Sequence, residues 1–152
     1  MAYLAHQIQI IKWTISHDSN TPARPIIATG MKYWIFLDDE RHPIDVDWSR
    51  DVVKRFNNAA EYSSYIICRN LDDVLTSIKN NEIEHISFDH DLGLQDENGF
   101  EITGYTILKH LIDMHIRGML SYLPTCSFHS KNPIGVENMK SYYENYLKIM
   151  EL

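Results

Sequence analysis

Two short predicted strands in this chain each end in a group of acidic residues. Tyr33–Leu37 is apolar throughout and is followed at once by Asp38 and Asp39. His85–Phe88 is a second buried segment, and Asp89 follows it directly. An apolar run without alternation is typical of a central strand in a parallel sheet, where both faces are covered. The pattern therefore predicts a parallel sheet with acidic groups at the ends of its strands.

Segments with helical periodicity separate the predicted strands. Further strands are expected at 65–68 and 120–128, and helices at about 48–62, from Asn70, from Thr103 to Gly118, and from Asn132 onward. Asn70, Thr103 and Asn132 are of the side-chain types that cap helix N-termini. The alternation of strands and helices from Tyr33 predicts a three-layer α/β fold with right-handed crossovers and helices on both faces of a parallel sheet.

The first thirty residues differ from the rest. Gln7–Ser16 alternates between apolar and polar residues, which predicts a half-buried strand at the edge of a sheet. Residues 17–30 contain two prolines and a glycine and are expected to form a loop. We therefore predict an N-terminal appendage over residues 1–30 and an α/β domain over residues 31–152.

Composition and charge exclude several classes of protein. The 152 residues are 44% apolar, enough for one sizeable core, and the net charge of −7 leaves no broad basic surface for duplex nucleic acid. A polynucleotide would have to be held locally, at an end or through a metal. Cys68 and Cys126 lie in apolar runs, which favours reduced thiols and a cytoplasmic protein. Neither a signal peptide nor a membrane span is predicted.

Chemically active side chains follow three of the predicted strands. The groups are Asp38, Asp39 and Glu40; Asp89, His90 and Asp91; and His129 with Ser130. Ligands of parallel α/β sheets bind outside the carboxyl ends of the strands, so we expect these groups to share one crevice. Carboxylate oxygens suit a hard divalent cation, Mg²⁺ or Mn²⁺, and the candidate metal ligands are Asp38, Asp39, Asp89 and Asp91.

Two further roles belong to the same crevice. His90 and His129 titrate near neutrality and are candidate acids and bases, or ligands of a softer metal, beside Asp89 as a catalytic candidate. Backbone amides at the start of the last helix can receive phosphate oxygens. The candidate phosphate-binding residues are Arg41, Ser130, Lys131 and Asn132. Phosphoryl chemistry is the function that this combination favours.

Each of these residues also has a simpler interpretation. Asp39 and Glu40 can be solvated loop acids paired with Arg41. His90 can be an ion-pair partner of its acidic neighbours, and His129 can cap the end of its strand. Asp91 can shape the turn that leads to Gly93.

Four motifs carry a resemblance to a known family. They are L-D-D-E-R-H-P at 37–43, S-F-D-H-D-L-G at 87–93, T-G-Y at 103–105 and H-S-K-N-P-I-G-V-E-N-M at 129–139. Over Tyr33–Tyr146 the chain resembles the cyclic-phosphate processing receiver-like domain of bacteria and their phages. The resemblance implies a receiver fold with flavodoxin-like strand order, and a role in processing cyclic phosphates such as those at broken RNA ends. If the protein is phage-encoded, the host cytoplasm is its expected location.

Comparison with ordinary signalling receivers gives roles to single residues and also shows departures. By this resemblance Asp38 and Asp39 match the magnesium-binding pair, Asp89 matches the phosphoacceptor, and Ser130 falls near the hydroxyl residue after the fourth strand. The chain shows no clear fifth strand with its terminal lysine, and it adds His90 and His129. Both departures favour a hydrolytic site over a phosphorelay switch.

Two functions from different classes are therefore predicted. The first is a metal-dependent phosphoesterase, a cyclic phosphate hydrolase acting on a 2′,3′-cyclic RNA end or a small cyclic nucleotide. The second is a non-catalytic receiver-like module that binds a phosphorylated ligand or accepts a phosphoryl group on Asp89. The sequence does not indicate an oligomeric state.

Overall fold

The computed structural model describes residues 32–57 and 64–151, which form a parallel sheet covered by helices. The strands are β1 (Tyr33–Leu37), β2 (Ser64–Cys68), β3 (Ile83–Phe88) and β6 (Thr125–Phe128), in the order β2-β1-β3-β6. All three neighbouring pairs are parallel. The order is the flavodoxin-like order without its last strand, so the predicted α/β receiver fold is confirmed.

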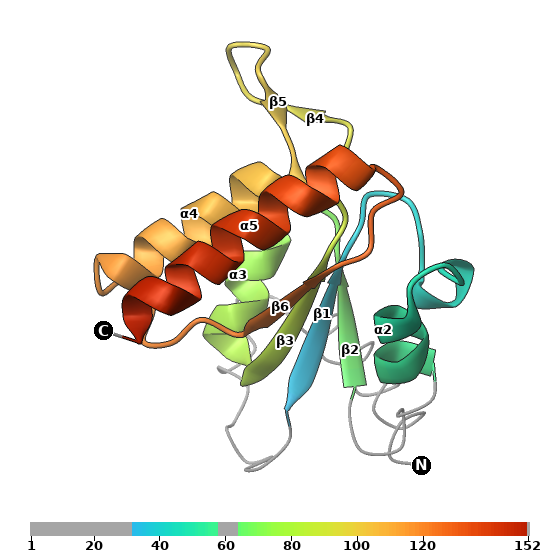
Figure 1. Ribbon diagram of the computed structural model, residues 1–152, viewed down its shortest axis with the longest axis horizontal. Helices are drawn as coiled ribbons and strands as arrows, with labels where there is room; N and C mark the ends of the chain where they lie inside the picture. Colours follow the sequence, from blue (N-terminus) through green and yellow to red (C-terminus); the bar gives the residue numbers. More distant parts are fainter. Residues whose placement is uncertain (1–31, 58–63, 152) are drawn as a thin grey trace, which may run out of the picture.

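Helices cover both faces of the sheet (Figure 1). On one side lie α3 (Leu71–Asn80), α4 (Gly104–Ile116) and α5 (Pro133–Met150), and on the other lie α2 (Arg50–Val52) and a turn of π-helix (Val53–Asn57). Side chains of a strand alternate between faces, so Ile35 enters the larger core while Phe36 packs against Val52 and Phe56 on the other side. The predicted three-layer arrangement is confirmed.

The three predicted helix caps are also confirmed. The side chain of Asn70 accepts a hydrogen bond from the Asp73 amide at 2.8 Å. Thr103 accepts one from Thr106 at 3.2 Å, and Asn132 accepts one from Gly135 at 3.0 Å. Each cap fixes the point at which the chain turns from a loop near the sheet edge into a helix.

Several predicted boundaries are wrong. The last strand begins at Thr125 and not at Leu120, because Pro124 has no N–H for the ladder and the amides of Met119 and Leu120 bond to Met114 instead. The helical segment predicted from Trp48 begins at Arg50, as α2 followed by the π-helical turn, and residues 58–62 of it lie outside the described residues. The short 3-10 helix η1 (Pro43–Asp45) precedes it.

Three further segments are the loop after Gly93, the N-terminal residues and the chain after β6. The polar segment after Gly93 contains a small hairpin, β4 (Leu94–Gln95) with β5 (Glu101–Ile102), which projects from the sheet (Figure 1). The appendage predicted over residues 1–30 lies outside the described residues. Among the residues that are described, no strand follows β6, in agreement with the missing fifth strand.

The two cysteines are free thiols. Cys68 and Cys126 form no disulfide, and burial raises the pKa of Cys68 to about 12, so this thiol stays protonated at neutral pH. No helix in the described ranges is long and apolar enough to cross a membrane.

Candidate functional site

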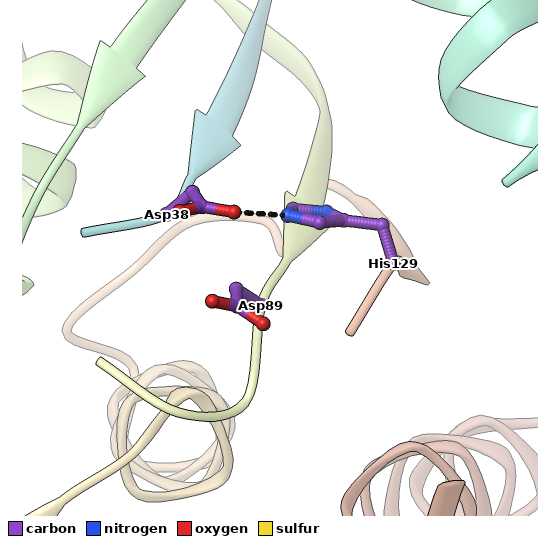
Figure 2. A group of neighbouring side chains, drawn as sticks. All are labelled: Asp38, Asp89 and His129. Atoms are coloured by element: carbon purple, nitrogen blue, oxygen red, sulfur yellow. Dashed lines mark hydrogen bonds and ion pairs between the residues drawn. The ribbon is translucent and has the colours of Figure 1, made fainter. Parts of the chain in front are cut away.

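The residues that follow β1, β3 and β6 meet at one edge of the sheet. Asp38, Asp89 and His129 are each one residue beyond a strand, and the Asp89 and His129 amides still bond to carbonyls of the neighbouring strand at 2.8 and 2.9 Å. Their side chains are buried, and the atoms with which they can bind a metal lie within 4.8 Å of one another. Figure 2 shows the three side chains converging. The predicted gathering of these strand ends is thus observed.

His129 is held in a fixed orientation. Its Nε2 lies 3.1 Å from Asp38 Oδ2, and its Nδ1 lies 2.7 Å from the Ser87 hydroxyl. A carboxylate can only accept, so Nε2 carries the proton that it donates to Asp38. The imidazole also stacks on Phe36, with 4.4 Å between the ring centroids and 9° between the planes. The ring therefore faces Asp38 and not solvent.

Asp38 is an ionised carboxylate inside the protein. Burial by itself raises the pKa of Asp38, but hydrogen bonds from His129 and from the Arg41 and Glu40 amides outweigh burial and bring the pKa to about 2. The two amides lie 2.8 and 3.0 Å from Oδ1. Asp38 thus fixes the start of the loop that follows β1 as well as the imidazole.

A pH dependence of stability follows from Asp38. Its pKa falls from 3.8 in the unfolded chain to about 2, so its contribution to folding is complete above pH 4 and is lost as the pH falls toward 2. The shift corresponds to about 2 kcal/mol. Urea unfolding of the metal-free protein at pH values from 2 to 7 should show Asp38→Asn losing this amount at neutral pH. The same loss at pH 2 would contradict the assignment.

The pKa of Asp89 is shifted upward, in the opposite direction to that of Asp38. Burial raises the pKa of Asp89, and the negative charge of Asp38 raises it further, while His129, Ser130 and the His90 amide oppose the shift incompletely. The guanidinium of Arg41 lies 3.5 Å from Asp38 and 3.7 Å from Asp89, and about a third of the Arg41 side chain is exposed. The negative charge of the two carboxylates is therefore only partly balanced within the protein.

A pocket of about 290 Å³ opens beside these carboxylates. Its lining residues are Asp39, Glu40, Arg41, Asp89, Asp91, Gly93, Ser130 and Lys131. Most of the predicted metal- and phosphate-binding residues therefore share one cavity. Its volume is at the lower limit of small-molecule sites, which span ~300–1,000 Å³.

His90 and Asn132, like the buried Asp38 and His129, do not line this pocket. The ring of His90 packs on α5, so closely that a Cβ on Gly135 would lie 2.4 Å from its Cγ. Its Nδ1 bonds to Asp91 at 2.8 Å. Asn132 caps α5 and lies 3.4 Å from the carboxylate of Asp91. Both residues therefore reach the pocket through Asp91.

Sequence reasoning missed two residues that shape the site. Trp48 donates a hydrogen bond from Nε1 to the carbonyl of His129 at 2.7 Å, across 81 positions of the chain. Arg69 donates from one nitrogen to the carbonyls of Asp38 and Arg41 at 2.8 and 2.9 Å. No local pattern indicates either contact, because each depends on the folded arrangement of distant loops.

One family of known proteins matches most of the chain. No curated protein and no solved structure matches it. The family described as the cyclic-phosphate processing receiver domain matches residues 33–145, which include all four strands of the sheet and every residue of the pocket. The chain belongs to the cyclic-phosphate processing receiver domain family.

Proposed function

We propose that this protein is a metal-dependent phosphoesterase that opens a cyclic phosphate, either a 2′,3′-cyclic RNA end or a small cyclic nucleotide. The observation that carries the proposal is the convergence of Asp38, Asp89 and His129 beside a pocket that also contains Arg41 and Lys131. Such a combination offers ligands for a cation and positive groups for a phosphate. The family description supports cyclic phosphates as the ligand class.

The donor set fits a divalent cation. The carboxylates of Asp38 and Asp89 suit Mg²⁺ or Mn²⁺, with Asp39 and Asp91 available at the pocket wall. Both ring nitrogens of His129 are already hydrogen-bonded, to Asp38 and Ser87, so the imidazole would orient Asp38 and would not bind the ion itself. The raised pKa of Asp89, which burial and the charge of Asp38 cause, is what a site for an additional positive charge would show without one. When bound, such an ion polarises the phosphate and lowers the pKa of a bound water.

Residues of the pocket would bind the phosphate and transfer the proton. Arg41 and Lys131 can pair with the non-bridging oxygens, and the Ser130 hydroxyl can donate to one of them. Hydrolysis forms a bond from a water oxygen to phosphorus, breaks one ester bond of the ring, and moves a proton to the departing oxygen. Asp91 lies at the pocket wall and bonds to His90, so this pair is placed to carry that proton. His129 would keep Asp38 in place.

Phosphate affinity is expected to depend on the metal. Asp39, Glu40, Asp89 and Asp91 line the pocket, against only two cationic side chains, so an anion is repelled until a cation binds. Calorimetry with inorganic phosphate should therefore show at least about tenfold tighter binding with Mn²⁺ than with EDTA, within the usual range of coupling between sites. Equal affinities in the two conditions would contradict a shared site.

The enzyme assignment is tested by turnover. Purified protein would be incubated with a panel of 2′,3′-cyclic and 3′,5′-cyclic nucleotides, in EDTA and with Mg²⁺ or Mn²⁺ restored. We expect metal-dependent ring opening that Asp89→Ala abolishes while the fold is retained. An absence of turnover across the panel, or full turnover by a folded Asp89→Ala variant, would sink the assignment.

The alternative function is a module that accepts a phosphoryl group on Asp89. It is favoured by the position of this carboxylate, which lines the pocket at the end of β3. A stable acyl phosphate on Asp89 after incubation with acetyl phosphate and Mg²⁺, together with no turnover of the panel, would support this module over the enzyme.

A further inference from the structure

We infer that Trp48 is a positioning residue that holds the two cations of the pocket, Arg41 and Lys131, where they can bind a phosphate. The Lys131 ammonium lies 4.2 Å from the centroid of the Trp48 ring, and the Arg41 guanidinium carbon lies 5.1 Å from it. The inference takes phosphate as the ligand from the proposed function, but it does not require turnover.

Two positive groups on one indole are an arrangement that needs support. Like charges repel, and long cationic side chains lose conformational freedom when they are held. The electron-rich face of tryptophan attracts both, since it is the strongest of the aromatic partners for a cation. Arg41 is also drawn toward Asp38 and Asp89 at 3.5 and 3.7 Å. The ring and the carboxylates together can therefore keep both cations beside the pocket.

The ring itself is anchored to the site. Trp48 precedes α2, and its Nε1 donates to the carbonyl of His129, directly after β6. Lys131 follows two residues later, so one side chain joins the loop that begins at Asp38 to the loop that carries Ser130 and Lys131. Loss of the indole would release both loops from each other as well as the two cations.

If Trp48 positions the two cations, its loss should weaken phosphate binding but not metal binding. The proposed metal ligands Asp38 and Asp89 are held by backbone hydrogen bonds to the neighbouring strands, at Cys68 and Leu37, and Asp38 is held also by His129. Trp48→Leu should therefore weaken binding of inorganic phosphate about 5- to 10-fold in the presence of Mn²⁺, from the range of cation–π energies. The affinity for Mn²⁺ alone should stay within about twofold.

The chain offers a matched control at Trp34. This tryptophan also has a cation over its ring, Arg55 at 5.8 Å, and also donates from Nε1, to Glu84 at 2.8 Å. The cation over Trp34 does not line the pocket, whereas the two cations over Trp48 do. Trp34→Leu removes the same kind of contacts elsewhere on the sheet, so it should leave phosphate binding unchanged. Trp48→Phe, which keeps an aromatic face, should recover part of the affinity that Trp48→Leu loses.

A double-mutant comparison separates positioning from general damage. In the Lys131→Ala background, Trp48→Leu should weaken phosphate binding by a smaller factor than in the wild-type chain, because one of the two cations is already gone. The inference is overturned if Trp48→Leu leaves phosphate affinity unchanged, if Mn²⁺ affinity falls in parallel, if Trp34→Leu has an equal effect, or if the wild-type protein binds no phosphate with Mn²⁺. Turnover with an unchanged KM in Trp48→Leu would remove this role and leave the enzyme assignment. Trp48-dependent phosphate binding without turnover would do the reverse.

Discussion

Asp89→Asn is expected to stabilise the metal-free protein and to abolish its response to metal. Burial and the charge of Asp38 raise the pKa of Asp89, which means that the ionised carboxylate is less favourable in the folded protein than in the unfolded chain. An asparagine of the same shape removes the charge and can still accept the His90 amide at 2.9 Å. Asp38→Asn should have the opposite effect, because hydrogen bonds keep that pKa at about 2.

Chemical denaturation in EDTA measures the stability of the metal-free protein, and denaturation in Mn²⁺ measures the gain from metal. In EDTA the order from most to least stable should be Asp89→Asn, wild type, Asp38→Asn. In Mn²⁺ the wild-type protein should gain about 2.7 kcal/mol at a metal concentration one hundred times the Kd, and Asp89→Asn should gain nothing. Asp89→Asn that is less stable than wild type in EDTA, or that gains equally from Mn²⁺, would contradict this account of the charges.

Gly104→Ala is expected to destabilise the protein by about 3 kcal/mol or more, at the upper end of the cost of overpacking. Alanine is a better helix former than glycine by ~1 kcal/mol, so helix propensity alone predicts the opposite. However, a Cβ on Gly104 would lie 1.8 Å from the carbonyl oxygen of Asp89. The Gly104 amide also donates to the His90 carbonyl at 2.7 Å, so the start of α4 cannot move away without losing that bond.

Gly135 provides the comparison, because its neighbour is a side chain. A Cβ there would lie 2.4 Å from the imidazole of His90, and removal of that ring opens the space. Gly135→Ala should destabilise the wild-type chain but have little effect in a His90→Ala background, whereas His90→Ala should not rescue Gly104→Ala. Urea unfolding of the five variants gives both couplings. Wild-type stability in Gly104→Ala would show that the close backbone approach is not needed.

The sequence was sufficient for the sheet and for the convergence of its acidic ends. Apolar runs that stop at Asp38 and Asp89 mark strands whose ends must meet in a parallel sheet, and side chains such as Thr103 mark helix starts by local chemistry. The orientation of His90 could not be obtained in this way, because it depends on the space beside Gly135 in a helix that begins 43 residues later.

The contacts of Trp48 could not be predicted from the sequence either. Its indole is near the pocket because two loops, separated by 81 positions, bond to each other once the sheet has formed. Periodicity reports which face of an element is buried, but it does not report which loops meet at the end of a sheet. Residues that position a site from a neighbouring loop therefore require the three-dimensional structure.

A titration of Mn²⁺ followed by EPR tests the proposed metal centre most directly, because the signal of free Mn²⁺ is lost on binding. Asp113→Asn is a suitable control, since this exposed carboxylate of α4 pairs with Arg117, the residue after the helix. We predict that the wild-type chain and Asp113→Asn bind one Mn²⁺ per chain, and that Asp38→Asn and Asp89→Asn bind it at least about tenfold more weakly, as expected when a charged ligand is lost. Undiminished binding by Asp89→Asn, or no binding by the wild-type chain, would contradict the account.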